Sequence, residues 1–206
     1  GDVIMLEMQA TGAGGSYGPA ELEFAVWEAT RVATDAGVIV VAAAGNGNQD
    51  LDAAVYDTYR QWGDSGAILV GAGTADTAHT PMDFSTFGAR VDVQGWGQFV
   101  FTLGYGDFAQ LGGDRHQSYT AVFSGTSSAT PGGATAAAAV QEFAIDRSGL
   151  PLPPRGVRSL LIDSGIPQGL GKEVGPFPDL PAAFVMIDDD GDSAMDILYG
   201  GLDCDD

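Results

Sequence analysis

The sequence is poor in cysteine and in basic residues. A single cysteine, Cys204, excludes an internal disulfide framework and any zinc site built from cysteines alone. Only eight side chains are basic, seven arginines and Lys172, against 28 acidic ones, so the formal net charge is −20. Because such a surface repels phosphate backbones and anionic lipids, we expect no nucleic-acid or membrane partner and a protein that recruits cations.

Long apolar runs are also missing. The longest, such as residues 38–44, are far too short to cross a bilayer, and no basic-then-apolar leader opens the sequence, so any targeting segment is expected upstream or removed. With 206 residues and 45% hydrophobic content, the chain is long enough to enclose one substantial hydrophobic core but short for two independent ones. The 31 glycines follow no repeat period, which indicates tight turns and close packing.

Apolar segments predict an α/β fold. Residues 2–8, 38–44 and 67–71 each contain a dense apolar run typical of a buried strand, and we expect the first to be covered on both faces. Between the first two, apolar residues recur at helical spacing from Pro19 to Gly37. This strand, helix, strand order favours a right-handed parallel crossover and a mainly parallel sheet.

The second half of the chain changes character twice. Residues 95–113 are rich in glycine and aromatics, which indicates loops and short antiparallel strands. Residues 126–147 are alanine-rich and predict a long helix that tolerates Pro131 because it falls near the first turn. Residues 155–164 predict one more short helix, and beyond Pro181 we expect order to fade into an acidic tail.

A serine stands behind a glycine turn at the start of the long helix. Residues 125–131 read Gly-Thr-Ser-Ser-Ala-Thr-Pro, with Ser127 at the helix opening. Unpaired N–H groups and partial positive charge at a helix start stabilise the negative charge that builds up on a carbonyl under attack by a hydroxyl. The alternative is that Thr126 or Ser127 only caps the helix, which is the commonest reason to find such residues there.

An asparagine, Asn46, follows the predicted strand over residues 38–44. Ligand sites of open parallel sheets gather at the carboxyl ends of strands. Taken alone, this position is better explained by an ordinary Asn-Gly turn.

The two motifs together resemble the subtilase family of serine proteases. Gly-Thr-Ser-x-Ala-x-Pro at residues 125–131 comes about eighty residues after Val-Ile-Val-Val-Ala-Ala-Ala-Gly-Asn at residues 38–46. Residues 67–73 and Phe-Ser-Thr-Phe-Gly at residues 84–88 fall where the family has its next core strand and a Phe-Ser-x-x-Gly turn, and residues 90–97 are similar to one bacterial branch. The resemblance covers roughly residues 2–183. It implies the C-terminal part of a subtilisin-like three-layer α/β fold, with helices on both faces of the sheet.

The resemblance also implies roles for individual residues. Ser127 matches the nucleophile that forms an acyl-enzyme, and Asn46 matches the side chain that donates to the oxyanion, with the Ser127 N–H as second donor. Thr126 would support this site from behind. The complete protein is then expected to be a secreted endopeptidase acting on polypeptide substrates. The alternative is a catalytically inactive binding or structural module with the same sheet.

Six positions match the family's substrate-binding segments, one strand that aligns the substrate and one wall of the primary specificity pocket: Glu7, Met8, Gln9, Ala43, Ala44 and Gly45. Glu7 replaces a small residue of the usual pattern and Gln9 replaces a glycine. An acidic Glu7 either favours a basic substrate residue or has a structural role in its branch.

Two members of the family's Asp-His-Ser triad have no match in this sequence. The family order places both before the strand at residues 2–8. His79 and His116 follow Asn46, match no catalytic position, and are expected in solvated loops. Three explanations remain open, which are a nicked protease, a separate N-terminal half that carries Asp and His, or a degenerate protein; we favour a fragment.

The end of the sequence is acidic, with eight aspartates in residues 188–206 and no basic partner. Aspartates around a glycine turn can converge on one Ca²⁺ ion, and the tail resembles thrombospondin type-3 calcium repeats, although the spacing is not that of an EF-hand. The alternative is a solvated acidic linker. We therefore divide the chain into residues 1–184 and a calcium-binding tail, residues 185–206. Its candidate ligands are Asp188, Asp190, Asp192, Asp196, Asp203 and Asp205.

Overall fold

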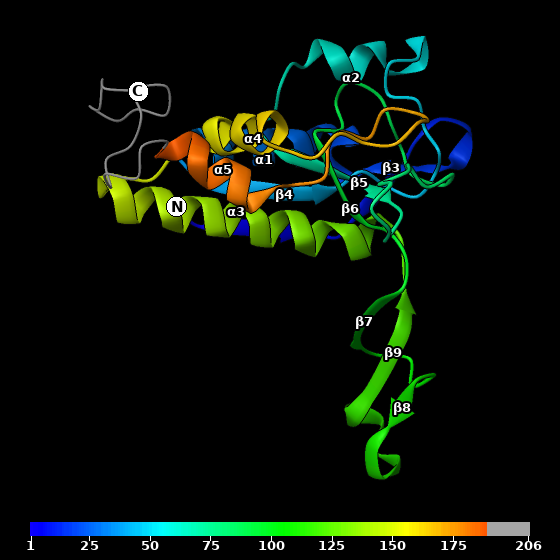
Figure 1. Ribbon diagram of the computed structural model, residues 1–206. Helices are drawn as coiled ribbons and strands as arrows, with labels where there is room; N and C mark the ends of the chain where they lie inside the picture. The colour runs from blue at the N-terminus through cyan, green and yellow to red at the C-terminus, as the bar shows by residue number, and fades with distance from the viewer. Residues whose placement is uncertain (189–206) are drawn as a thin grey trace.

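The computed structural model describes residues 1–188, and its centre is a parallel sheet (Figure 1). The sheet order follows the chain, since each new strand adds beside the previous one in parallel register, with Val3 opposite Ile39 and Val41 opposite Ile68. The expected α/β class with a mainly parallel sheet is confirmed. The four strands are β1 (Val3–Leu6), β4 (Ile39–Ala43), β5 (Ile68–Gly73) and β6 (Val93–Trp96).

Helices cover both faces of this sheet, so the body has three layers. One apolar cluster joins Ile39, Val41 and Val70 to α3 (Thr126–Ser148), α4 (Pro154–Asp163) and α5 (Leu180–Ile187). A second cluster joins Ala42 and Leu69 to α1 (Phe24–Asp35) and α2 (Asp57–Gln61). Neighbouring residues of a strand therefore face different layers, as the strand period of two requires.

The long helix α3 lies very close to the sheet because its sheet-facing side chains are small. Gly133, Ala136 and Ala137 are buried there. A Cβ atom added at Gly133 would lie 2.9 Å from a methyl carbon of Val70, closer than real Cβ contacts. Within residues 1–188, no helix combines the length and the apolarity that crossing a bilayer requires.

Two smaller antiparallel sheets complete the fold. The first pairs β2 (Gln9–Thr11) with β3 (Tyr17–Pro19). The second has the order β7-β9-β8 and projects away from the three-layer body (Figure 1). Its strands are β7 (Val100–Leu103), β8 (Ala109–Gln110) and β9 (Ser118–Phe123), and it confirms the antiparallel strands expected after residue 95.

The structure corrects three expectations from the sequence. The first strand is not covered on both faces, since β1 is the edge of the described sheet and Ile4 and Met5 are each 44% exposed. The helix after Pro19 begins only at Phe24, behind a short 3₁₀ turn. The first residues after Pro181 are helical and not part of a tail, because α5 continues to Ile187, whose side chain is fully buried.

Buried charges form a network at the amino ends of β5 and β6. The guanidinium of Arg90 lies 3.0 Å from the Glu21 carboxylate and 2.7 Å from that of Asp92. Tyr59 and Ser65 donate hydrogen bonds to Glu21, and burial raises the pKa of Tyr59 above its usual range. Although burial by itself lowers the pKa of Arg90, the two carboxylates raise it, so the guanidinium stays charged.

Replacing this arginine tests how much the network contributes to stability. We expect Arg90→Met to lower the free energy of unfolding by about 3–5 kcal/mol, because it leaves Glu21 buried without its cation and Asp92 with only Arg158, 3.8 Å away. Arg31→Met is the control, since Arg31 pairs with Glu28 and Asp35 on the exposed side of α1 and should cost no more than about 1 kcal/mol. Urea unfolding monitored by circular dichroism measures both; equal losses would contradict the assignment.

Candidate active site

The asparagine motif and the serine motif meet at the carboxyl edge of the sheet. Asn46 follows β4, and its side-chain oxygen accepts hydrogen bonds from the backbone N–H and the hydroxyl of Thr126, at 2.8 and 3.0 Å. The Thr126 hydroxyl in turn accepts from the backbone N–H of Gly45 at 3.1 Å. The two motifs are therefore joined by three hydrogen bonds across 80 residues of sequence.

Glycine makes this approach possible on both sides. Gly45 has φ +95°, and a Cβ atom there would lie 2.6 Å from the backbone of Gly18. Gly125 precedes α3 with φ +106°, and a Cβ atom there would lie 3.1 Å from the amide nitrogen of Asn46. Since an L side chain rarely adopts such φ values, the two glycines fix where the strand ends and the helix begins.

Ser127 sits in the first turn of α3 and is partly exposed, as is Asn46. Among the residues that the structure describes, neither the hydroxyl nor the backbone N–H of Ser127 has a hydrogen-bond partner. The side-chain oxygen of Asn46 accepts hydrogen bonds from Thr126, while its side-chain nitrogen has no acceptor within residues 1–188. Two unpaired N–H donors and a free hydroxyl thus occur together at a positively polarised helix start.

The expected substrate-binding residues divide into two groups. Gln9 joins the site, since its side-chain oxygen accepts from the backbone N–H of Asn46 at 3.1 Å. Glu7 and Met8 are exposed between β1 and β2 and have side chains available to a ligand. The pocket-wall positions Ala43, Ala44 and Gly45 are buried, so only their backbone could line a site.

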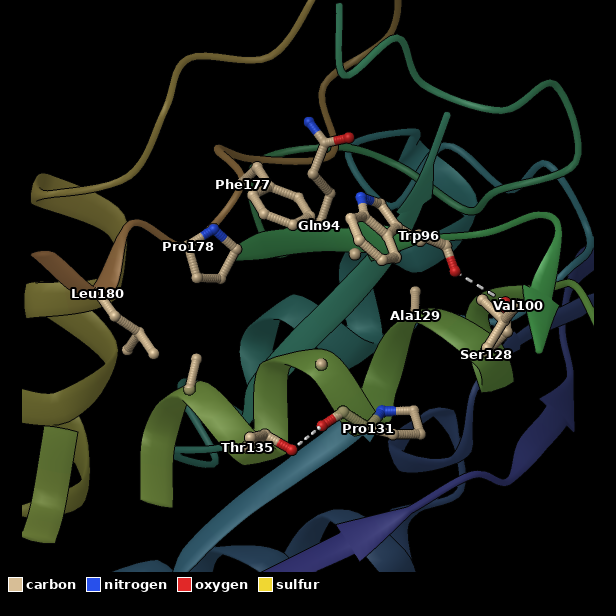
Figure 2. Close-up of a pocket in the computed structure, with 13 residues that line it drawn as sticks. Gln94, Trp96, Val100, Ser128, Ala129, Pro131, Thr135, Phe177, Pro178 and Leu180 are labelled. Carbon is tan, nitrogen blue, oxygen red and sulfur yellow. Dashed lines mark hydrogen bonds between the residues drawn. The ribbon is translucent and has the colours of Figure 1, made fainter. Parts of the chain in front are cut away.

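An apolar cavity with a volume of about 410 Å³, which sequence reasoning missed, lies beside this site; Figure 2 shows the residues that line it. It lies between the first turns of α3, the end of β6 and the segment before α5, with Trp96, Pro131 and Phe177 among its walls. Ser128 closes one side, and its hydroxyl donates to the Trp96 carbonyl at 2.8 Å. In the sequence, only the aromatic residues could have indicated a binding surface here. No local pattern indicated that Phe177 would stack on Trp96.

The two histidines differ in environment. His116 is exposed, as expected, in a short 3₁₀ turn. The expectation of a solvated loop is wrong for His79, which is only 8% exposed and stacks on Phe177 with ring centroids 4.5 Å apart. Within residues 1–188 neither ring has a hydrogen bond to Ser127.

Of the six expected calcium ligands only Asp188 belongs to the described residues; the positions Asp190, Asp192, Asp196, Asp203 and Asp205 lie outside them. One carboxylate oxygen of Asp188 lies 3.2 Å from Nε of Arg147. The other, Oδ1, is buried with no hydrogen-bond partner inside the described part. Residues 1–188 contain no group of three His, Cys, Asp or Glu side chains placed to hold a metal ion.

Comparison with known proteins agrees with this geometry. A model described as "Subtilase family" matches residues 9–200. No curated protein matches the sequence significantly. Among solved structures, a cold-adapted subtilisin-like serine proteinase superimposes with a TM-score of 0.56 at 22% identity, over 86% of this chain and 55% of that one.

Two further structures superimpose at a similar level. The PatG macrocyclase in complex with a peptide gives a TM-score of 0.61 at 20% identity, over 89% of this chain and 51% of that one. The S218A mutant of the PatA protease domain gives 0.62 at 21% identity, over 89% and 58%. At these identities the likeness shows the fold alone, and this chain spans little more than half the length of each structure.

A glycine-to-alanine pair tests the fit of the helix start. We expect Gly125→Ala to destabilise the chain by roughly 1–3 kcal/mol, because alanine disfavours the backbone conformation and its Cβ meets Asn46. Gly132→Ala is the control, since Gly132 lies in the same helix with open space around it, and alanine there should stabilise by up to about 1 kcal/mol. Thermal unfolding measures both, and an unchanged or raised midpoint for Gly125→Ala would contradict the geometry.

Proposed function

The chain belongs to the subtilase family, and from that premise we propose that it carries the nucleophile half of a serine endopeptidase. Ser127 is the proposed nucleophile, and its hydroxyl attacks the carbonyl of a peptide bond. A general base takes the Ser127 proton and gives it to the departing amine as the C–N bond breaks, and water then hydrolyses the acyl-enzyme. The observation that carries the proposal is the pairing of Asn46 with the turn that presents Ser127.

The proposed oxyanion site follows from how that pairing uses the Asn46 amide. Its oxygen accepts from Thr126, which fixes the side-chain orientation and leaves its nitrogen to donate. The Ser127 N–H is the second proposed donor. Thr126 is a positioning residue in this scheme, since it holds Asn46 and does not touch substrate.

The triad Asp and His are proposed to come from outside residues 1–206, in a longer chain or in an N-terminal half that is a separate chain. The support is that this chain spans little more than half of the related structures and that its own histidines do not reach Ser127. Peptide substrates fit the family, and the PatG macrocyclase was solved with a peptide. Secretion is part of the proposal on the family resemblance and the acidic tail. The competing function is an inactive module with the same sheet.

Activity-based labelling of the protein with its upstream residues present tests the proposal. We expect a fluorophosphonate probe to label it and Ser127→Ala to abolish labelling. Asn46→Ala should lower turnover by about 10²–10³, a magnitude known from loss of the corresponding donor in subtilisin. The control is Asn48→Gly, since Asn48 lies in the same loop with φ +51° and should accept glycine with near-normal turnover.

The same labelling experiment separates the two functions. An unlabelled intact protein whose behaviour Ser127→Ala leaves unchanged would favour the inactive module. Sequencing upstream of Gly1 gives an independent check, since the protease needs an Asp-Gly and a His-Gly-Thr-type motif there.

We further propose that the acidic tail binds Ca²⁺, with Asp188, Asp190, Asp192, Asp196, Asp203 and Asp205 as candidate ligands. Carboxylates are the ligands that Ca²⁺ prefers. Oδ1 of Asp188 supports the proposal, because it is buried and has no hydrogen-bond partner in the described residues. The other oxygen, Oδ2, is paired with Arg147, so Asp188 can offer a cation one oxygen without breaking that ion pair.

Calorimetric titration of the whole chain tests the tail. We expect saturable heat with a Kd of about 10⁻⁴–10⁻³ M, the range of extracellular calcium modules. Asp190→Asn with Asp192→Asn should remove most of it, while Asp107→Asn with Asp163→Asn, the same charge change at exposed positions, should not. Absence of heat at millimolar calcium would leave the tail as a solvated linker.

A further inference from the structure

The projecting sheet β7-β9-β8 exposes an apolar face that the proposed chemistry does not use. Phe101 and Leu103 alternate on β7, and Leu103 pairs across the sheet with Tyr119 of β9. Phe101 stacks on Tyr119 with ring centroids 5.9 Å apart and meets Phe108 edge-on at 5.1 Å. We name Phe101, Leu103, Phe108 and Tyr119 the aromatic face. Leu103 is 69% exposed, so this face is open in the described part of the chain.

The charge of this segment sets it apart from the rest of the protein. Residues 97–124 contain two aspartates and one arginine, whereas the whole chain has 28 acidic and 8 basic residues. An exposed apolar patch of low charge on an otherwise strongly acidic surface marks a contact site for an uncharged, apolar partner.

The base of the sheet is fixed to the turn that presents Ser127. The Gly125 N–H donates to the Gly97 carbonyl at 3.0 Å, and the Ser128 hydroxyl donates to the Trp96 carbonyl at 2.8 Å. β9 runs back toward the three-layer body (Figure 1) and ends at Phe123, two residues before Gly125. The projecting sheet is therefore anchored at its base to the candidate active site, and the aromatic face lies farther out along β9.

The other side of the site is occupied by the segment at Glu7, Met8 and Gln9, which reaches Asn46 through Gln9. That segment therefore contacts the site at Asn46, whereas the base of the projecting sheet contacts it at the turn that presents Ser127. The outer edge of β7 has no strand beside it within residues 1–188, so an extended chain can also add there through main-chain hydrogen bonds.

From this arrangement we propose that the aromatic face binds the part of a polypeptide substrate that lies on the leaving-group side of the scissile bond. The inference rests on the proposed protease function and deepens it. The occupant is an extended segment with apolar side chains. With a strand rise of ~3.4 Å per residue, the four steps from Tyr119 to Phe123 and the turn to Ser127 are spanned by roughly five or six substrate residues. Short substrates therefore do not reach the face.

Two peptides with the same acyl-side sequence test this inference on the protein with its upstream residues present. One ends two residues beyond the scissile bond, and the other continues for ten residues with apolar side chains at the fifth to eighth. We expect Leu103→Ser to lower kcat/KM for the long peptide about tenfold, by the apolar area it no longer buries, and to leave the short one unchanged. Leu103 is 69% exposed and is not one of the stacked rings, so Phe101 keeps its ring contacts with Phe108 and Tyr119 in this variant.

Two control variants keep the test decisive. Leu103→Met retains the apolar volume and should retain the preference for the long peptide. Val122→Ser changes an exposed side chain on the opposite face of β9 and should also retain it.

The outcomes distinguish failure of this inference from failure of the protease function on which it rests. If intact protein cleaves neither peptide, the protease proposal fails. If it cleaves both and Leu103→Ser leaves their ratio unchanged, or lowers both equally, the aromatic face does not bind substrate. Concentration-dependent dimerisation in sedimentation that Leu103→Ser abolishes would overturn the inference in favour of a second copy.

Discussion

The side-chain oxygen of Asn46 and the backbone of Thr126 form the contact on which the site depends. It holds the end of β4 against the start of α3, two segments that are 80 residues apart. Because the oxygen is engaged, the amide nitrogen has a set direction, and because Thr126 uses its N–H, the next free N–H of the helix belongs to Ser127. Preorganised donors of this kind stabilise developing charge without reorganising during a reaction. The two glycines with positive φ and the small sheet-facing side of α3 all serve to bring this pair together.

Much of the body follows from local patterns in the sequence. The buried strands at residues 39–43 and 68–73 are continuous apolar runs, and α3 is a long alanine-rich segment closed by Gly149, so each is specified within its own residues. That Asn46 and the serine turn belong to one site was predicted only because the two motifs matched one family pattern together. Each motif alone fits a turn or a cap.

The features that sequence reasoning missed all depend on distant partners. β1 is apolar, yet Ile4 and Met5 are exposed, because β1 has a neighbouring strand on only one side in the described residues. The apolar composition of the strand alone does not determine this. His79 is buried because Phe177, almost a hundred residues later, stacks on it. α5 was taken for the start of an acidic tail because the aspartates that follow it dominate the composition, yet its own residues are apolar and pack against α3.

The small residues on the inner side of α3 also constrain how this protein can change. Because a Cβ atom at Gly133 would already clash with Val70, the space between α3 and the sheet cannot hold a larger side chain. We expect a larger residue on the sheet-facing side of α3 to displace the whole helix. Its amino-terminal turn moves with it. Substitutions between α3 and the sheet would therefore misplace the Ser127 turn at the carboxyl edge of the sheet. Selection for activity would then also act on buried alanines and glycines of α3 that do not contact a substrate.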